Sequence, residues 1–306
     1  MIVAAGDWHR SRFSVNCDKI EFLSSTESEG RQARRTATGH QHSTVGVFER
    51  ALSKLESKFL RSATRRRTCK MTDIDIIRVQ RLDFLVSPLA WSFAADRRTE
   101  IEDYFTHLRR GKPQLWNGRV LLLRDFEISD TTLQGTMFET DYASFIAWRD
   151  WGFPDRRVRA CFAMGALLSR DGAFLLGVMN AHTAGAGGIY FPAGVPDPGD
   201  VVHGRVDFDR NVRREIAEET GLSLEGIAAD PWLLVLAQQR VALIKVFRFR
   251  KSAADMRASI LDHLQKEALP ELSDVHIVRD PSDFKPSMPP FVRAFLLHFW
   301  DCDSER

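Results

Sequence analysis

The stretch "RREIAEETGL", residues 213–222, places Glu215, Glu218 and Glu219 within five consecutive positions. On a helix, positions i, i+3 and i+4 lie on one face. Like charges at this spacing cost about 0.2–0.5 kcal/mol per pair, and each carboxylate near the negative end of the helix dipole costs about 0.3–1 kcal/mol. Because this arrangement opposes folding, it predicts a bound cation that compensates the charge.

Carboxylate oxygens are ligands that Mg²⁺ prefers, usually together with phosphate groups of a substrate. The neighbouring residues predict a helix over 208–220. Val212 and Ile216 would bury its opposite face, Arg214 can pair with a carboxylate one turn later, and Gly221 suits the left-handed position after the helix. The alternative interpretation of the glutamates alone is a solvated acidic helix end.

Composition indicates a soluble globular chain. Of 306 residues, 44% are hydrophobic and 27% charged, which is enough to form a sizeable core. No apolar run reaches the roughly 18–20 residues that a membrane span needs, and the N-terminus lacks the pattern of a signal peptide. Widely spaced cysteines without metal-binding spacing indicate free thiols, so we expect a cytoplasmic protein with no membrane partner. These cysteines are Cys17, Cys69, Cys161 and Cys302.

The first part of the chain differs from the rest. Residues 1–70 contain 14 Lys and Arg against 7 Asp and Glu, with little apolar patterning, and predict a basic, disordered leader. A basic tail could instead contact RNA. We prefer the flexible leader, so nucleic acid is not an expected partner, and the oligomeric state is left open.

Apolar patterning begins at residue 71. The sequence "DIIRVQRL" (75–82) alternates like a strand, and further strands and helices up to 156 predict a small α+β segment. From 157, two apolar strands joined by "RDG" precede a Gly/Pro-rich loop, 181–200, and the helix of the glutamates. Short strands interrupted by helices predict an α/β layered fold with a mixed sheet.

The motif "REIAEETGL" resembles the second half of the Nudix box, the signature of the Nudix hydrolases. Every fixed position of that half is met from Arg214 to Leu222. The first half departs from the pattern, because Val206 occupies the slot of its glutamate. An alternative alignment places Gly194 and, after five residues, Asp200 there, with a six-residue insertion before the helix.

The resemblance implies an α/β/α sandwich over 157–303, preceded by the 71–156 segment. It also implies Mg²⁺-dependent hydrolysis of a nucleoside diphosphate linked to another moiety, with release of a nucleoside monophosphate; Mn²⁺ is an alternative metal. Glu215 is the first choice for the general base, with Glu267 and Glu271 as alternatives from a later loop. The implied metal-site residues are Glu215, Glu218, Glu219, the carbonyl of Gly194, and Arg214 as the group that orients them.

The substrate is predicted from weaker features. The region before the box resembles the branch of the family that includes UDP-sugar hydrolases, which favours a nucleotide-sugar such as UDP-glucose over ADP-ribose or a dinucleotide. Four side chains are candidates for substrate binding, although core or surface roles are the alternative for each: Trp116, Tyr142, His182 and Asp200.

A second function class stays open. A Nudix-fold module could bind a nucleotide as a regulatory signal without hydrolysing it. Loss of the helix glutamates is the usual mark of such a module, and here all three are present.

Overall fold

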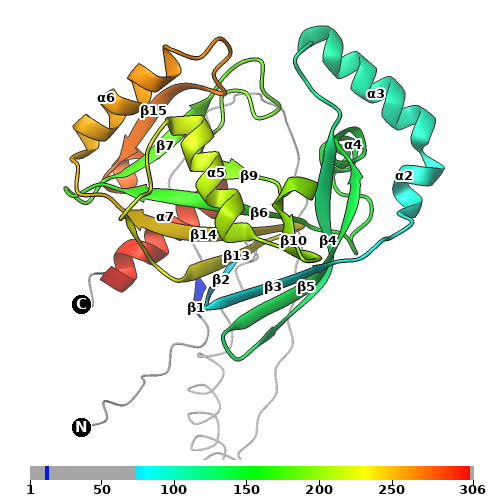
Figure 1. Ribbon diagram of the computed structural model, residues 1–306, viewed down its shortest axis with the longest axis horizontal. Coiled ribbons are helices and arrows are strands. Elements are labelled where there is room, and N and C mark those ends of the chain that lie inside the picture. The colour runs from blue at the N-terminus through cyan, green and yellow to red at the C-terminus, as the bar shows by residue number, and fades with distance from the viewer. Residues whose placement is uncertain (1–10, 14–73, 304–306) are drawn as a thin grey trace, which may run out of the picture. The chain divides into compact units, whose positions relative to one another are not determined.

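The computed structural model describes residues 11–13 and 74–303, which belong to one compact unit (Figure 1). Most of the predicted leader, 1–70, lies outside the described residues. Among those that are described, no helix combines the length and apolar character that a membrane span requires. Cys161 and Cys302 are free thiols, as the sequence predicted.

The larger of two sheets is mixed and has ten strands within the described residues. Strands β14 and β6 pair in parallel, whereas β6 and β7 form the antiparallel hairpin predicted at "RDG". The main path runs β1 (Ser11–Phe13), β2 (Ile74–Val79), β13 (Trp232–Ala237), β14 (Arg240–Arg248), β6 (Ala160–Leu168), β7 (Phe174–Met179) and β15 (Leu272–Val278). Short strands β8 (Ile189–Tyr190), β9 (Ala193–Gly194) and β12 (Ala228–Ala229) pair beside this path.

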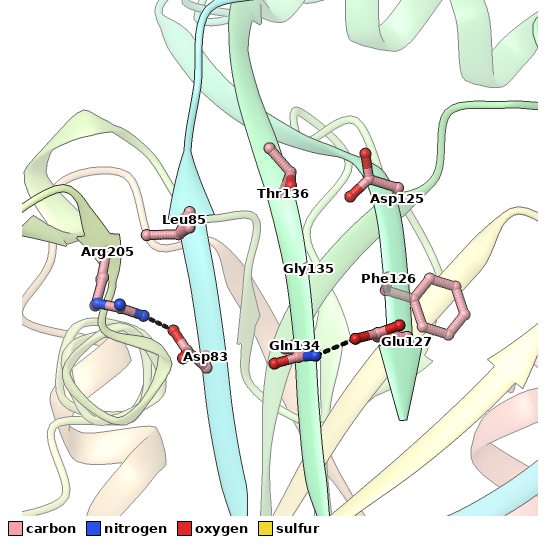
Figure 2. A pocket seen from close by; sticks show the side chains of 9 residues that line it. All are labelled: Asp83, Leu85, Asp125, Phe126, Glu127, Gln134, Gly135, Thr136 and Arg205. Atoms are coloured by element: carbon pink, nitrogen blue, oxygen red, sulfur yellow. Dashed lines mark hydrogen bonds and ion pairs between the residues drawn. The ribbon is translucent and has the colours of Figure 1, made fainter. Parts of the chain in front are cut away.

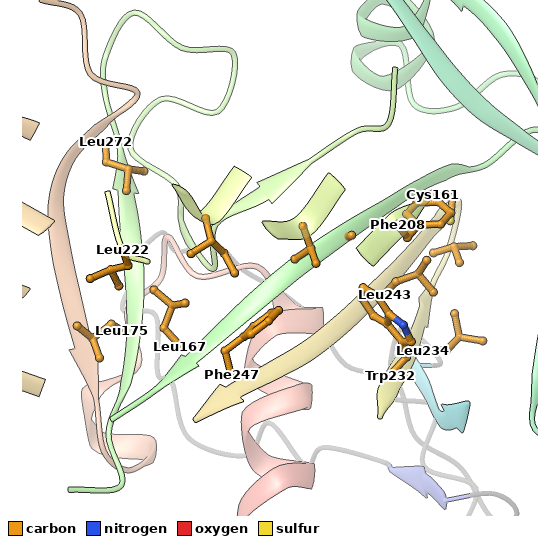
Figure 3. Close-up of a cluster of buried hydrophobic side chains, with 14 of the residues drawn as sticks. Cys161, Leu167, Leu175, Phe208, Leu222, Trp232, Leu234, Leu243, Phe247 and Leu272 are labelled. Atoms are coloured by element: carbon orange, nitrogen blue, oxygen red, sulfur yellow. The ribbon is translucent and has the colours of Figure 1, made fainter. Parts of the chain in front are cut away.

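Helices cover both faces of this sheet. Helices α5 (Phe208–Thr220) and α6 (Ala253–Leu264) bury their apolar faces in one core, together with Leu243 of β14 (Figure 3). The next residue, Ile244, points to the opposite core, where α7 (Pro290–Asp303) packs. Alternation along a strand buried on both sides produces these two cores. The predicted α/β layered fold with a mixed sheet is therefore confirmed.

The smaller, five-stranded sheet is also mixed, since β3 and β5 run parallel. One of its faces packs against three helices through a core rich in aromatic residues. The strand order is β10 (Val201–Val202), β11 (Arg205–Val206), β3 (Arg81–Val86), β5 (Thr132–Asp141) and β4 (Arg119–Ser129). The helices are α2 (Ser92–Asp96), α3 (Arg98–Gly111) and α4 (Tyr142–Asp150), and two 3₁₀ turns complete the fold, η1 (Pro198–Asp200) and η2 (Pro281–Asp283).

One sequence prediction is wrong in detail: the strand expected over 75–82 is two strands in different sheets. At the break, the amides of Gln80 and Arg81 both donate to the carbonyl of Thr131. That contact moves the chain from its pairing with β13 to its pairing with β5. The alternation in the sequence continues through the break, so periodicity alone could not reveal it.

The predicted six-residue insertion forms the hairpin β10–β11. Its two turn residues, His203 and Gly204, both have positive φ, as a two-residue hairpin turn requires. Arg205 then pairs with Leu85 of β3. The segments 71–156 and 157–303, expected as separate domains, therefore exchange strands: β2 joins the larger sheet, and this hairpin joins the smaller one.

A glycine sets how closely α5 approaches the larger sheet. A Cβ atom at Gly165 of β6 would lie 2.3 Å from Ile216 Cδ1 and 2.7 Å from its Cγ1. Gly165→Ala should therefore lower the free energy of unfolding by about 1–3 kcal/mol, measured by chemical denaturation.

The matched control is Gly111→Ala, because nothing lies within 4 Å of the added methyl group. In the double variant Gly165→Ala/Ile216→Ala the loss should be smaller than the sum of the two single losses, because the clashing atoms are gone. Strictly additive losses would contradict the close approach.

Candidate active site

Helix α5 forms as the sequence predicts. The carboxylate of Asp207 accepts a hydrogen bond of 2.9 Å from the amide of Arg210 and caps the first turn. Val212 and Ile216 are fully buried. Gly221 ends the helix with φ of 65°. Burial of Val212 and Ile216 fixes the rotation of α5 about its axis, and this rotation determines where the glutamates of the helix point.

The side chains of Glu215 and Glu219 both contact the backbone of strand β9. The amide of Ala193 donates to Glu219 Oε1 at 3.0 Å. A Cβ atom at Gly194 would lie 2.1 Å from Glu215 Oε1, so this position must be glycine for the carboxylate to sit there. The second oxygen of Glu219, Oε2, is buried and has no hydrogen-bond partner among the described residues.

Glu218 lies apart from this pair. Its side chain is 60% exposed, against 15% for Glu215, and it pairs with Arg214 at 2.9 Å. Arg214 also contacts Glu215 at 2.8 Å. The predicted pairing of Arg214 with Glu218 one turn later is therefore confirmed, and the same arginine also contacts Glu215.

Asp200 supports this arginine from the 3₁₀ turn η1. It is only 1% exposed, accepts 2.8 Å from the side-chain amide of Asn211, and lies 3.2 Å from a terminal nitrogen of Arg214. The sequence-based assignment of Asp200 to direct substrate binding is therefore corrected. Its carboxylate is buried against Arg214 and Asn211 and is not presented to a substrate in this structure.

The electrostatics of the face favour a cation. Burial raises the pKa of Glu215 to about 7, where the charge of Arg214 opposes the shift and Glu218 and Glu271 add to it. Burial also raises the pKa of Glu219 well above its ordinary value, against the lowering effect of the Ala193 amide. Burial thus disfavours the charged form of each carboxylate. A cation between the two carboxylates would stabilise that charged form.

Glu271 is one of the two alternative bases named from the sequence, and the structure brings its charge close to the glutamates of α5. It is exposed, yet its charge acts on both Glu215 and Glu219. Its own carbonyl accepts 2.8 Å from the amide of Asn180, which fixes the backbone at this point. Surrounding protein raises the pKa of Glu271, and the nearby His182 lowers it, so the structure brings His182 to this end of the site.

Other candidates are placed elsewhere. Glu267, the other alternative base, lies 3.3 Å from His263. Trp116 is 73% exposed and its ring folds over Gly118. No described contact joins Trp116 to the carboxylates. Tyr142, in contrast, is half-buried, and its hydroxyl feels the charge of Glu271.

These residues fit a hard divalent cation. Glu215, Glu219 and the backbone at Gly194 offer only oxygen donors, and the unpartnered Oε2 of Glu219 lies among them. Within the described part of the chain, no three His, Cys, Asp or Glu side chains are grouped closely enough to form a complete metal site. Mg²⁺ in proteins commonly uses one or two carboxylates and completes its shell with water and substrate phosphates.

A pocket of about 330 Å³ lies on the smaller sheet, not at the glutamates (Figure 2). Arg205 of the hairpin β10–β11 pairs with Asp83 at its side. Asp125 and Glu127 line the opposite side. None of the residues predicted for the active site lines this pocket.

The raised pKa of Glu215 predicts a pH-dependent stability. In metal-free protein the folded state holds this proton more tightly than the unfolded state, whose pKa is near 4.5. Stability is therefore lost as pH rises from about 4.5 through about 7. Glu215→Gln should raise the free energy of unfolding at pH 8 by a value on the order of 3 kcal/mol, and the gain should vanish near pH 4.

Denaturation in EDTA at both pH values measures this effect. The control is Glu218→Gln, whose side chain is mostly exposed and whose removal should change stability by less than about 0.5 kcal/mol. A Glu215→Gln protein less stable than the wild type at pH 8 would show that the carboxylate is not strained by burial.

Comparison with known proteins gives fold neighbours only. No family model matches the chain, and no curated protein matches it. Among solved structures, a Nudix hydrolase from M. smegmatis, RenU, is 12% identical over 48% of this chain and 86% of its own, with a TM-score of 0.32.

Two further neighbours have similar values. The MutT protein from Methanosarcina mazei Go1 is 16% identical over 48% of this chain and 96% of its own, with a TM-score of 0.31. A bifunctional NMN adenylyltransferase/ADP ribose pyrophosphatase from Francisella tularensis is 13% identical over 51% of this chain and 45% of its own, with a TM-score of 0.35. The structural neighbours are thus Nudix hydrolases at low identity and partial coverage.

Proposed function

We propose that this chain is a divalent-metal-dependent hydrolase that cleaves the diphosphate linkage of a nucleoside diphosphate bound to another moiety. One observation carries the proposal: Glu219 and Glu215 meet the backbone of β9 at Ala193 and Gly194, and the buried Oε2 of Glu219 has no hydrogen-bond partner among the described residues. A cation would stabilise the charged form of these two carboxylates, and a cation in this position would take further oxygen ligands. A diphosphate supplies them.

The residues divide the work. Glu215, Glu219 and the carbonyl of Gly194 would hold Mg²⁺ or Mn²⁺, with Glu218 available at the exposed edge. A cation held there would neutralise phosphate oxygens and make a bound water more acidic. Arg214 and Asp200 keep the carboxylates in place. Water then adds to one phosphorus, the bridging P–O bond breaks, and the leaving phosphate departs as the product anion.

We assign Glu271 as the general base, which accepts the proton of the attacking water. Glu271 is exposed, and its raised pKa suits a base that works near neutral pH. Glu215, the first choice from sequence, lies instead against the backbone of Gly194, where it serves better as a metal ligand. Glu267 instead pairs with His263, so we do not assign it as the base.

The first test is hydrolysis of a substrate panel with Mg²⁺: UDP-glucose, ADP-ribose, dinucleoside polyphosphates and coenzyme A. We expect release of a nucleoside monophosphate, with UDP-sugars the favoured class and cytoplasmic metabolites the natural pool. Glu219→Gln should lower kcat/KM by roughly a thousandfold or more, because it removes a metal ligand. Calorimetric titration with Mn²⁺ should show weaker binding in the same variant.

Unchanged turnover in Glu219→Gln would refute the site. Metal and nucleotide binding without any turnover in the wild type would instead favour the non-catalytic binding module.

A second test separates the two late-loop glutamates. Glu271→Gln should lower kcat by about 10²–10⁴-fold while Mn²⁺ affinity changes little, because a base is lost and the main ligands stay. It should also remove the rise of activity with pH that deprotonation of the base produces. Glu267→Gln is the matched control and should stay within about twofold of wild type. Equal losses in both variants would exclude Glu271 as the base.

A further inference from the structure

We infer that Tyr142, Arg149 and Tyr190 form a subsite for the nucleoside monophosphate half of the substrate, beside the carboxylates of α5. The inference rests on the proposed hydrolase function and adds which part of the substrate binds where. It assigns this half to a surface built jointly by α4, from the 71–156 segment, and β8, from the 157–303 segment.

Tyr142 and Arg149 share one face of α4. They are seven residues apart, which is two turns. The ring of Tyr142 makes edge contacts with Phe105 and Phe145, which fix its plane. Arg149 uses its Nε to bind Asp150 at 2.7 Å, so the two terminal nitrogens of its guanidinium have no hydrogen-bond partner among the described residues.

Tyr190 approaches from the other segment. It lies on β8, three residues before Ala193, whose amide binds Glu219. A glycine-rich loop crosses its ring: a Cβ atom at Gly185 would lie 2.3 Å from the tyrosine hydroxyl, and one at Gly188 would lie 2.9 Å from the ring. The loop needs glycine at these two points in order to pass over Tyr190.

The same loop is fixed to the 71–156 segment. The ammonium group of Lys112, at the end of α3, donates to the carbonyl of Thr183. Ala184 packs against the aromatic core of α2–α4, as do Tyr142 and Val195. Tyr142, this loop and the chain just after Gly194 therefore border one region.

Charged side chains of both signs act on the two tyrosines of that region. The positive charge of Arg149 and the negative charge of Glu271 both act on the hydroxyls of Tyr142 and Tyr190. The negative charge of Glu219 also acts on the hydroxyl of Tyr190. Neither hydroxyl makes a hydrogen bond to a described residue. Two half-buried phenols without a hydrogen-bond partner among the described residues thus lie within electrostatic reach of these carboxylates and of Arg149.

This combination matches a nucleotide. Phenol hydroxyls can hydrogen-bond the ribose or the edge of a nucleobase. The planar fork of a guanidinium pairs with phosphate through two parallel hydrogen bonds. A cation at Glu215 and Glu219 would hold the diphosphate from one side, and Arg149 would hold the nucleotide's own phosphate from the other.

The test is calorimetric titration of the metal-free protein with AMP, UMP, GMP and CMP, and separately with glucose 1-phosphate and ribose 5-phosphate. At least one nucleoside monophosphate should bind more tightly than both sugar phosphates. Arg149→Met should weaken that binding at least tenfold, and Tyr142→Phe and Tyr190→Phe about threefold to tenfold each. In Mg²⁺-dependent hydrolysis, Arg149→Met should raise KM while kcat stays within about twofold.

Arg157→Met is the matched control, because that side chain is 81% exposed, and it should leave every value unchanged. Circular dichroism establishes that each variant is folded. Unaltered nucleotide affinity in the Arg149 variant, or tighter binding of sugar phosphates in the wild type, would overturn the subsite while hydrolysis persists. Nucleotide binding that needs Arg149, in a protein without any hydrolysis, would keep the subsite and reject the proposed function.

Discussion

Two buried carboxylates on successive turns of one helix, pressed against a neighbouring strand, are the constraint on which this structure depends. Glu215 and Glu219 can lie there only because α5 approaches the sheet closely at Gly165 and because β9 has no side chain at Gly194. Both close approaches are possible because glycine has no Cβ atom. Together they bring acidic side chains into a region where burial raises the pKa of both and so works against their charge. The helix is thus tightly packed, and its carboxylates are disfavoured in their charged form, at the same place.

The smaller sheet is connected to this site through the turn that precedes α5. Asp200 ends η1 and binds Arg214, and the chain then forms the hairpin that pairs with β3 before α5 begins. Phe208, the first residue of α5, packs edge-on against Phe84 of β3 with ring centroids 5.1 Å apart. The helix that carries the carboxylates is therefore fixed at its start by the smaller sheet and along its length by the larger one. A substrate surface built from both segments is consistent with that shared support.

Much of the fold and part of the site could be predicted because their signals are local. The period of Val212 and Ile216, the position of Gly221 and the spacing of the glutamates determine α5 and its acidic face without reference to other segments. The residues that complete the site came from long-range contacts. Glu271 is 52 positions from Glu219, and Tyr190 and Arg149 lie on different segments, so no pattern within a window of the sequence could relate them. The burial of Asp200 was equally hidden, since a short acidic side chain in a Gly/Pro-rich turn is usually exposed.

The sequence by itself determined the helix, its caps, its acidic face and the layered α/β class, because backbone conformation and amphipathic period depend on near neighbours. Only the tertiary structure decided which glutamates are buried and which one is solvated. It also decided that the strand-like run 75–82 divides between two sheets, and that the insertion before α5 serves as a pairing hairpin. The physical reason is that desolvation, strand pairing and close packing depend on atoms contributed by distant parts of the chain, and these meet only when the chain is folded.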